Sequence, residues 1–105
     1  MTFLESAIRE IKQADLNGLK YIDGSFYHIS GKSQNQIQGN RSEFLRNLRL
    51  DICDFLFDKL AVKFQVQFRD EHRDQFGKYY DRIRITWKKS IDHGFILNPA
   101  ELLNC

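Results

Sequence analysis

The densest group of side chains capable of acid–base or metal chemistry is the run Asp70-Glu71-His72-Arg73-Asp74. Carboxylates and imidazoles are common metal ligands, and His93 is the other histidine downstream. A catalytic metal site usually needs three such ligands on stiff elements, whereas this run lies in a predicted turn. The neighbouring arginines would also repel a cation. We therefore expect a solvated turn here, with no bound metal and no cofactor.

Other catalytic arrangements are equally weak. Asp51, Asp54 and Asp58 share one stripe of a predicted helix, which is typical of a solvated helix face as well as of a divalent-ion site. His28 falls in a predicted hairpin, where a half-buried sheet residue is expected rather than a base. The chain contains no nucleophile elbow, no glycine-rich phosphate loop and no Cys–His pair. These observations favour a protein that is not an enzyme.

Two segments, 62–69 and 82–88, alternate between apolar and polar residues as half-buried strands do. If the apolar side chains face the core, the intervening cations emerge together on the other face of the sheet, and no acidic residue within the two strands joins them. These cations are Lys63, Arg69, Arg82, Arg84 and Lys88. Such a face suits a phosphate backbone or an acidic protein. The alternative is that the cations serve only solubility and protection of the strand edges.

The tip between these strands, from Asp70 to Tyr80, mixes aromatic and cationic residues around a glycine. The candidates for binding there are Arg73, Phe76, Lys78 and Tyr80. Such side chains can stack on unpaired bases or fill a pocket on a protein. The alternative is that Phe76 and Tyr79 fold back onto the edge of the core.

The elements that must position these residues follow from capping and periodicity. A first helix is predicted from Thr2, with Glu5 completing a capping box and Asn17-Gly18 ending it. A short hairpin, 19–22 with 25–29, is expected to turn on Asp23-Gly24 because both residues tolerate positive φ. A loop covers 30–40, and a closing helix is predicted to begin at Asn98-Pro99.

The helix predicted over 42–60 is apolar around more than half of its circumference. A helix of this kind packs on two sides or holds a partner, which in a small domain requires a curled sheet or a homodimer. The predicted order is therefore α-β-β-α-β-β-α. We expect an α+β fold in which an antiparallel sheet of two hairpins packs on one long central helix and an N-terminal helix.

Length and composition indicate one domain over residues 1–105, with enough apolar and aromatic residues for a core. Cys53 falls in an apolar helical pattern and is expected to be a buried thiol, and Cys105 is distant from it. No apolar run approaches a membrane span and no secretory signal is evident, so a cytoplasmic protein is expected.

The charge of the chain is unevenly distributed. The net charge is +2, but residues 61–90 hold eight basic and four acidic side chains. The predicted function is therefore a non-enzymatic module whose basic hairpin face docks on nucleic acid or on a protein complex that handles nucleic acid. The alternative is a protein-binding regulator, such as an adaptor, an immunity or antitoxin-like factor, or a phage-type inhibitor of a larger machine.

Overall fold

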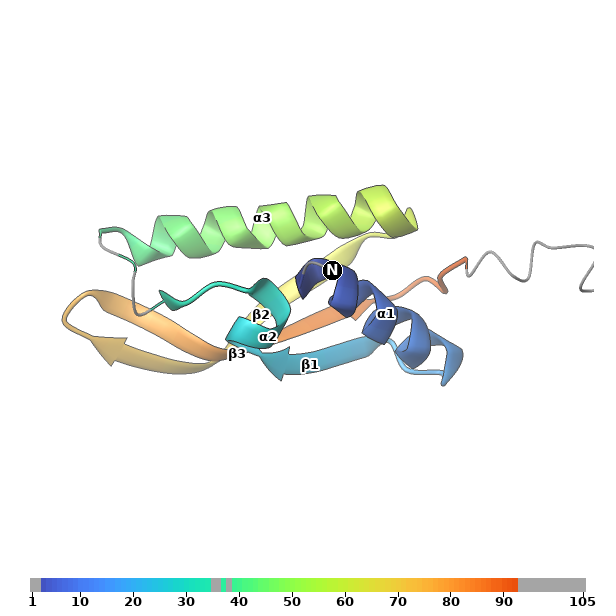
Figure 1. Ribbon diagram of the computed structural model, residues 1–105, viewed down its shortest axis with the longest axis horizontal. Coiled ribbons are helices and arrows are strands. Elements are labelled where there is room, and N and C mark those ends of the chain that lie inside the picture. The colour runs from blue at the N-terminus through green and yellow to red at the C-terminus, as the bar shows by residue number, and fades with distance from the viewer. Residues whose placement is uncertain (1–2, 35–36, 38, 93–105) are drawn as a thin grey trace, which may run out of the picture.

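A computed structural model describes residues 3–34, 37 and 39–92 of the chain. Its elements follow in the order α1 (Phe3–Leu16), β1 (Tyr21–Ser25), α2 (Phe26–Ser30), α3 (Arg41–Leu60), β2 (Phe64–Asp74) and β3 (Gly77–Trp87) (Figure 1). The predicted α+β class with an antiparallel sheet is confirmed, but the described sheet has three strands rather than four. The closing helix predicted from Asn98 lies outside the described residues.

The strands are ordered β1-β3-β2, with β3 in the centre and both pairings antiparallel. In the long β2–β3 hairpin, Phe64 lies opposite Trp87 and Asp74 lies opposite Gly77, in one register that is interrupted at Asp70. The helices pack on one face of this sheet, and α3 runs along its length (Figure 1). The molecule is therefore a two-layer structure with its other sheet face uncovered by the described helices.

The core lies between the two layers and contains side chains from every described element except β1. Its innermost members, with at most 1% exposure, are Ile11, Ile29, Ile52, Leu56, Ile83 and Ile85. The predicted alternation of β2 and β3 places Phe64, Val66 and Trp87 in this core as well. Burial of these apolar side chains is the main favourable term holding the helices on the sheet.

Helix α3 begins one residue before the prediction and is covered on one side. The side chain of Asn40 accepts a hydrogen bond from the backbone N–H of Glu43, which caps the first turn. Leu50 and Phe57 are 54% and 52% exposed, so the second apolar side that the sequence suggested has no covering element in the described chain. Cys53 is half-buried rather than fully buried, and burial raises the pKa of its thiol.

The predicted hairpin on Asp23-Gly24 is wrong. Both residues lie within β1, where Asp23 is opposite Arg84 and Gly24 is opposite Ile83. Glycine allows close approach there, because a Cβ on Gly24 would lie 3.1 Å from Cδ1 of Ile29 in α2 and would require that side chain to shift by a few tenths of an ångström. Gly24 therefore marks close helix–strand packing and not a turn.

The predicted second strand of that hairpin is helix α2. Ser25 ends β1 and caps α2, since its hydroxyl accepts a hydrogen bond from the N–H of His28. His28 is exposed, with Nε2 3.3 Å from a carboxylate oxygen of Glu10, and it is not the half-buried strand residue that we expected. A short local capping interaction thus outweighed strand propensity.

A buried carboxylate that the sequence analysis did not single out joins the ends of the fold. Asp15, near the end of α1, accepts hydrogen bonds from Nε1 of Trp87 at 3.0 Å and from the N–H of Ile91 at 3.1 Å. Nζ of Lys20 lies 2.8 Å from the same carboxylate. Because a buried carboxylate needs such partners, Asp15 fixes α1 to the residue before β1 and to the end of β3.

No helix among the described residues is long and apolar enough to cross a membrane.

Candidate binding surface

The outward face of the sheet carries the polar side chains that alternate with the core. In β2 and β3 these are Gln65, Gln67, Arg69, Arg82, Arg84 and Thr86, each exposed or half-buried. Arg69 lies directly opposite Arg82, so two cations are neighbours across the strands. Lys63 precedes β2 and Lys88 follows β3, and both are exposed. We call Lys63, Arg69, Arg82, Arg84 and Lys88 the basic face.

Strand β1 adds a carboxylate to this face. Oδ1 of Asp23 is 3.3 Å from Nε of Arg82, and Oδ2 of Asp23 is 3.0 Å from Nη2 of Arg84. Partial burial opposes ionisation, but the hydrogen bond from Arg84 and the charge of Arg82 hold the pKa of the Asp23 carboxyl below its ordinary value. The ion-pair partner of both arginines therefore comes from the third strand, β1, which the alternation of β2 and β3 did not include.

The cations of the basic face therefore differ in freedom. Arg84 is held between Asp23 and the ring of Tyr21, whose centroid lies 5.0 Å from the guanidinium carbon. By contrast, Lys63, Arg69 and Lys88 form no ion pair with any residue that the structure describes. Three cations are open to a ligand, and two are already oriented by an acid.

The hairpin tip is shorter and more ordered than expected. Residues 70–74 and 77–80, predicted as part of a long turn, belong to β2 and β3, so only Gln75 and Phe76 connect the strands. The Asp74 carboxylate accepts a hydrogen bond from the N–H of Phe76 at 2.8 Å. Phe76 is 55% exposed and remains available at the end of the hairpin.

The other predicted tip residues converge on Glu71. Its carboxylate lies 3.5 Å from Arg73 Nε and 3.7 Å from Lys78 Nζ, and it accepts a hydrogen bond from the Tyr80 hydroxyl at 3.2 Å. Desolvation raises the pKa of the Glu71 carboxyl, but its interactions with Lys78, Tyr80 and Arg73 outweigh this effect and hold the pKa below its ordinary value. Burial raises the pKa of the Tyr80 hydroxyl, and the hydrogen bond with the negatively charged Glu71 raises it further. Three of the predicted binding residues, Arg73, Lys78 and Tyr80, therefore share Glu71 as a partner and form a local network.

Tyr80 is also fixed through its backbone and its ring. The side-chain amide of Gln34 donates to the Tyr80 carbonyl and accepts from its N–H, as a neighbouring strand would. The ring centroid of Tyr80 lies 5.8 Å from that of Phe68. Tyr80 therefore lies along the hairpin stem, whereas Phe76 lies at its end.

The buried side chain of Arg41 connects the start of α3 to the hairpin. Its Nη1 donates to Asp74 at 2.6 Å, its Nη2 donates to the carbonyl of Gln34 at 3.2 Å, and its guanidinium lies over the ring of Tyr79. Sequence analysis missed Arg41, because a cation at the first turn of a helix is ordinarily solvated. Its charged partner Asp74 lies 33 residues further along the chain, so no local pattern could reveal the interaction.

The run 70–74 has separate partners for its titratable groups. Asp74 pairs with Arg41, His72 pairs with Asp81 and stacks on Tyr79, and Glu71 belongs to the network described above. The hydrogen bond from Arg41 holds the pKa of Asp74 below its ordinary value. Within the described residues no three potential metal ligands are grouped together. The helix aspartates Asp51, Asp54 and Asp58 are exposed.

Comparison of the chain with protein-family models, with curated proteins and with solved structures found no match.

Proposed function

We propose that this protein is a non-enzymatic cytoplasmic module that binds nucleic acid, alone or within a nucleoprotein complex, through its basic face. The observation that supports the proposal most strongly is the outward face of the sheet, which no described helix covers and which carries five cations, two of them paired with Asp23. A surface of that composition attracts phosphates and releases their counterions on binding.

The basic face has a suitable length and a division of roles. From Arg82 to Lys88 it extends about 20 Å at roughly 3.3 Å per residue, long enough for several phosphates. The cations without ion pairs bind phosphates first. Arg84 can keep its bond to Asp23 and still donate to a phosphate, since a guanidinium has several N–H donors.

The first test removes the two arginines that Asp23 orients. Fluorescence anisotropy with labelled single-stranded and duplex oligonucleotides at low salt measures the affinity. The double change Arg82→Ala and Arg84→Ala should weaken binding about tenfold or more and reduce the salt slope by about 1 for each phosphate that the variant no longer neutralises. Lys12→Ala, on an exposed residue of α1, is the control. Absence of binding by the unaltered protein at low salt excludes the proposal.

The second test removes the acid instead of the arginines, and the affinity is expected to change in the opposite direction. Asp23→Asn removes the carboxylate that competes with phosphate for both arginines and should strengthen binding by several-fold. Asp51→Asn makes the same change of net charge on the exposed face of α3 and is the matched control. Equal effects of the two changes would mean that net charge, and not this face, governs the affinity.

A second candidate is a protein-binding regulator, such as an adaptor, an immunity or antitoxin-like factor, or a phage-type inhibitor. It is favoured by the exposed apolar side chains Leu50, Phe57 and Phe76, which suit a protein partner or a second copy of the chain. Purification from the native host, followed by the absorbance ratio and mass spectrometry, separates bound nucleic acid from bound protein. Sedimentation of the pure protein determines whether it forms a homodimer.

A further inference from the structure

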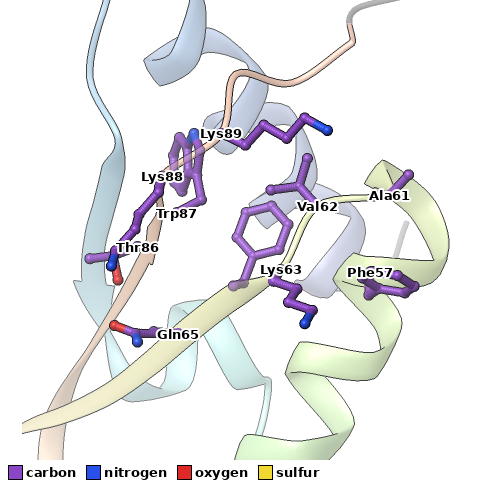
Figure 2. A pocket seen from close by; sticks show the side chains of 10 residues that line it. Phe57, Ala61, Val62, Lys63, Gln65, Thr86, Trp87, Lys88 and Lys89 are labelled. Carbon is purple, nitrogen blue, oxygen red and sulfur yellow. The ribbon is translucent and has the colours of Figure 1, made fainter.

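An apolar groove opens at the end of the sheet opposite the hairpin tip. It lies where the chain leaves α3 and enters β2, beside the point where β3 ends (Figure 2). Its volume is about 590 Å³, within the range of sites that bind specific ligands. The groove forms where α3 and β3 end and β2 begins, so the exposed side chain of Phe57 stands over the buried side chains of Val62, Phe64 and Trp87.

The floor and one wall of this groove are aromatic and aliphatic. Val62, Phe64 and Trp87 contribute the floor, with Phe64 and Trp87 rings 5.6 Å apart. The wall is Phe57 of α3, which is 52% exposed. The hydrogen bond from Trp87 Nε1 to buried Asp15 holds the indole in place. The apolar surface is therefore preformed, which lowers the entropic cost of binding.

Lysines surround the opening on different sides. Lys63 immediately precedes β2, while Lys88 and Lys89 follow the end of β3 (Figure 2). All three are exposed and make no ion pair with a described residue, and none of the described residues lining the groove is acidic. A ligand that fits must place an apolar group at the centre and negative charges around it.

We propose that this groove binds a short peptide segment of a partner protein in which an apolar side chain, such as Phe or Leu, is flanked by Asp and Glu residues. The apolar side chain packs against Phe57, Phe64 and Trp87, and the flanking carboxylates pair with the lysines. The groove shares Lys63 and Lys88 with the basic face, but peptide binding can be tested separately from nucleic-acid binding because it also requires Phe57, which is not part of that face.

The distribution of charge favours a peptide over a lipid or a fatty acid. A fatty acid has one carboxylate and a long chain that is best held in an enclosed tunnel. This groove is open, and its cations lie on two sides, so they match several carboxylates spread along an extended backbone. Charge complementarity around an apolar centre is also the usual anatomy of a protein interface.

The test uses the full chain and a labelled synthetic peptide carrying Phe and Leu between Glu and Asp residues. Trp87 is the sole tryptophan of the chain, so its emission reports occupancy of the groove directly while anisotropy measures affinity. The double change Lys63→Glu and Lys89→Glu should weaken binding about tenfold or more, and Phe57→Ala should weaken it severalfold. Replacing the peptide's Phe and Leu by Ser should abolish the change in Trp87 emission.

Matched controls use exposed residues that do not line the groove. Lys12→Glu changes one charge on α1, and Leu50→Ala truncates an exposed apolar side chain of α3, and neither should alter peptide binding. The proposal is overturned if the peptide does not bind. Occupation of the groove by residues 93–105 of the chain itself would give that result. It is also overturned if octanoate binds more tightly than the peptide, or if sedimentation shows a dimer that Phe57→Ala dissociates.

Discussion

The two halves of the β2–β3 hairpin share one register but are stabilised by different forces. In the half near the C-terminal end of α3, Phe64, Val66, Ile83 and Ile85 are buried beneath the helices. In the distal half, residues 70–78 are exposed, and polar contacts with Arg41, Gln34 and Glu71 hold the strands in place. Asp70, with a φ of 59°, adopts a left-handed conformation near the boundary.

The two halves of one hairpin can therefore differ in stability, although the same ladder of backbone hydrogen bonds joins the strands in both. Apolar burial is non-directional and survives small shifts, whereas ion pairs at the surface are weakened by water and salt. We expect the core half to open only with global unfolding and the distal half to open locally. The following predictions test that contrast in order of decreasing effect.

The largest effect is expected in the core half. Ile85 is fully buried, and Ile85→Ala should lower the free energy of unfolding by about 2–5 kcal/mol, because it leaves a cavity between β3 and the helices. Urea denaturation followed by circular dichroism measures the change. Thr86→Ala, on the outward face, is the control and should cost less than about 1 kcal/mol.

A local effect is expected for the buried arginine. Arg41→Ala removes the interactions with Asp74, Gln34 and Tyr79, so amide hydrogen exchange in the distal half should accelerate about tenfold or more. Exchange at Ile83 and Ile85 should change much less. Arg46→Ala, on an exposed residue of the same helix, is the control. If Arg41→Ala instead accelerates exchange equally in both halves, the hairpin is one cooperative unit.

The pH dependence of the distal half follows from Asp74. Arg41 holds the pKa of this carboxyl below its ordinary value, so the ion pair is complete above about pH 4 and is broken as the pH falls through the lowered pKa. Carboxyl chemical shifts in an NMR titration measure this value, and Arg41→Ala should move it up toward about 3.9. An unchanged Asp74 titration in that variant would contradict the pairing.

The smallest effect is expected at Glu71. Its partners Arg73 and Lys78 are exposed, so water and salt screen these ion pairs strongly. Glu71→Gln should leave the midpoint of urea unfolding unchanged within error and should increase only the exchange of the nearest amides. A clear drop in global stability would show that the distal network supports the core.

Part of the fold was predictable because it depends on local periodicity. Alternation in β2 and β3 correctly separated core from surface, and helical spacing located α1 and α3 within a residue of their ends. The prediction of the first hairpin failed because Asp23-Gly24 satisfies the rules for a turn and also suits a strand on which Ile29 packs closely. Two physical roles of one glycine cannot be separated without knowing what packs on it.

The candidate site was predictable to a similar extent. Strand parity placed Arg82 and Arg84 together on one face, but it did not reveal Asp23, which reaches them from some sixty residues earlier in the chain. The groove around Trp87 was also invisible, since its lining comes from the ends of three elements.

The sequence by itself determined which face of α1 and of the two long strands is buried, because the period of the backbone is local. Only the tertiary structure decided which charges meet. Asp23 reached Arg82 and Arg84 because β1 pairs with β3, and Arg41 reached Asp74 because α3 begins beside the hairpin turn. Coulombic and hydrogen-bonded interactions depend on distance in space, and distance in space is a property of the assembled layers rather than of any segment.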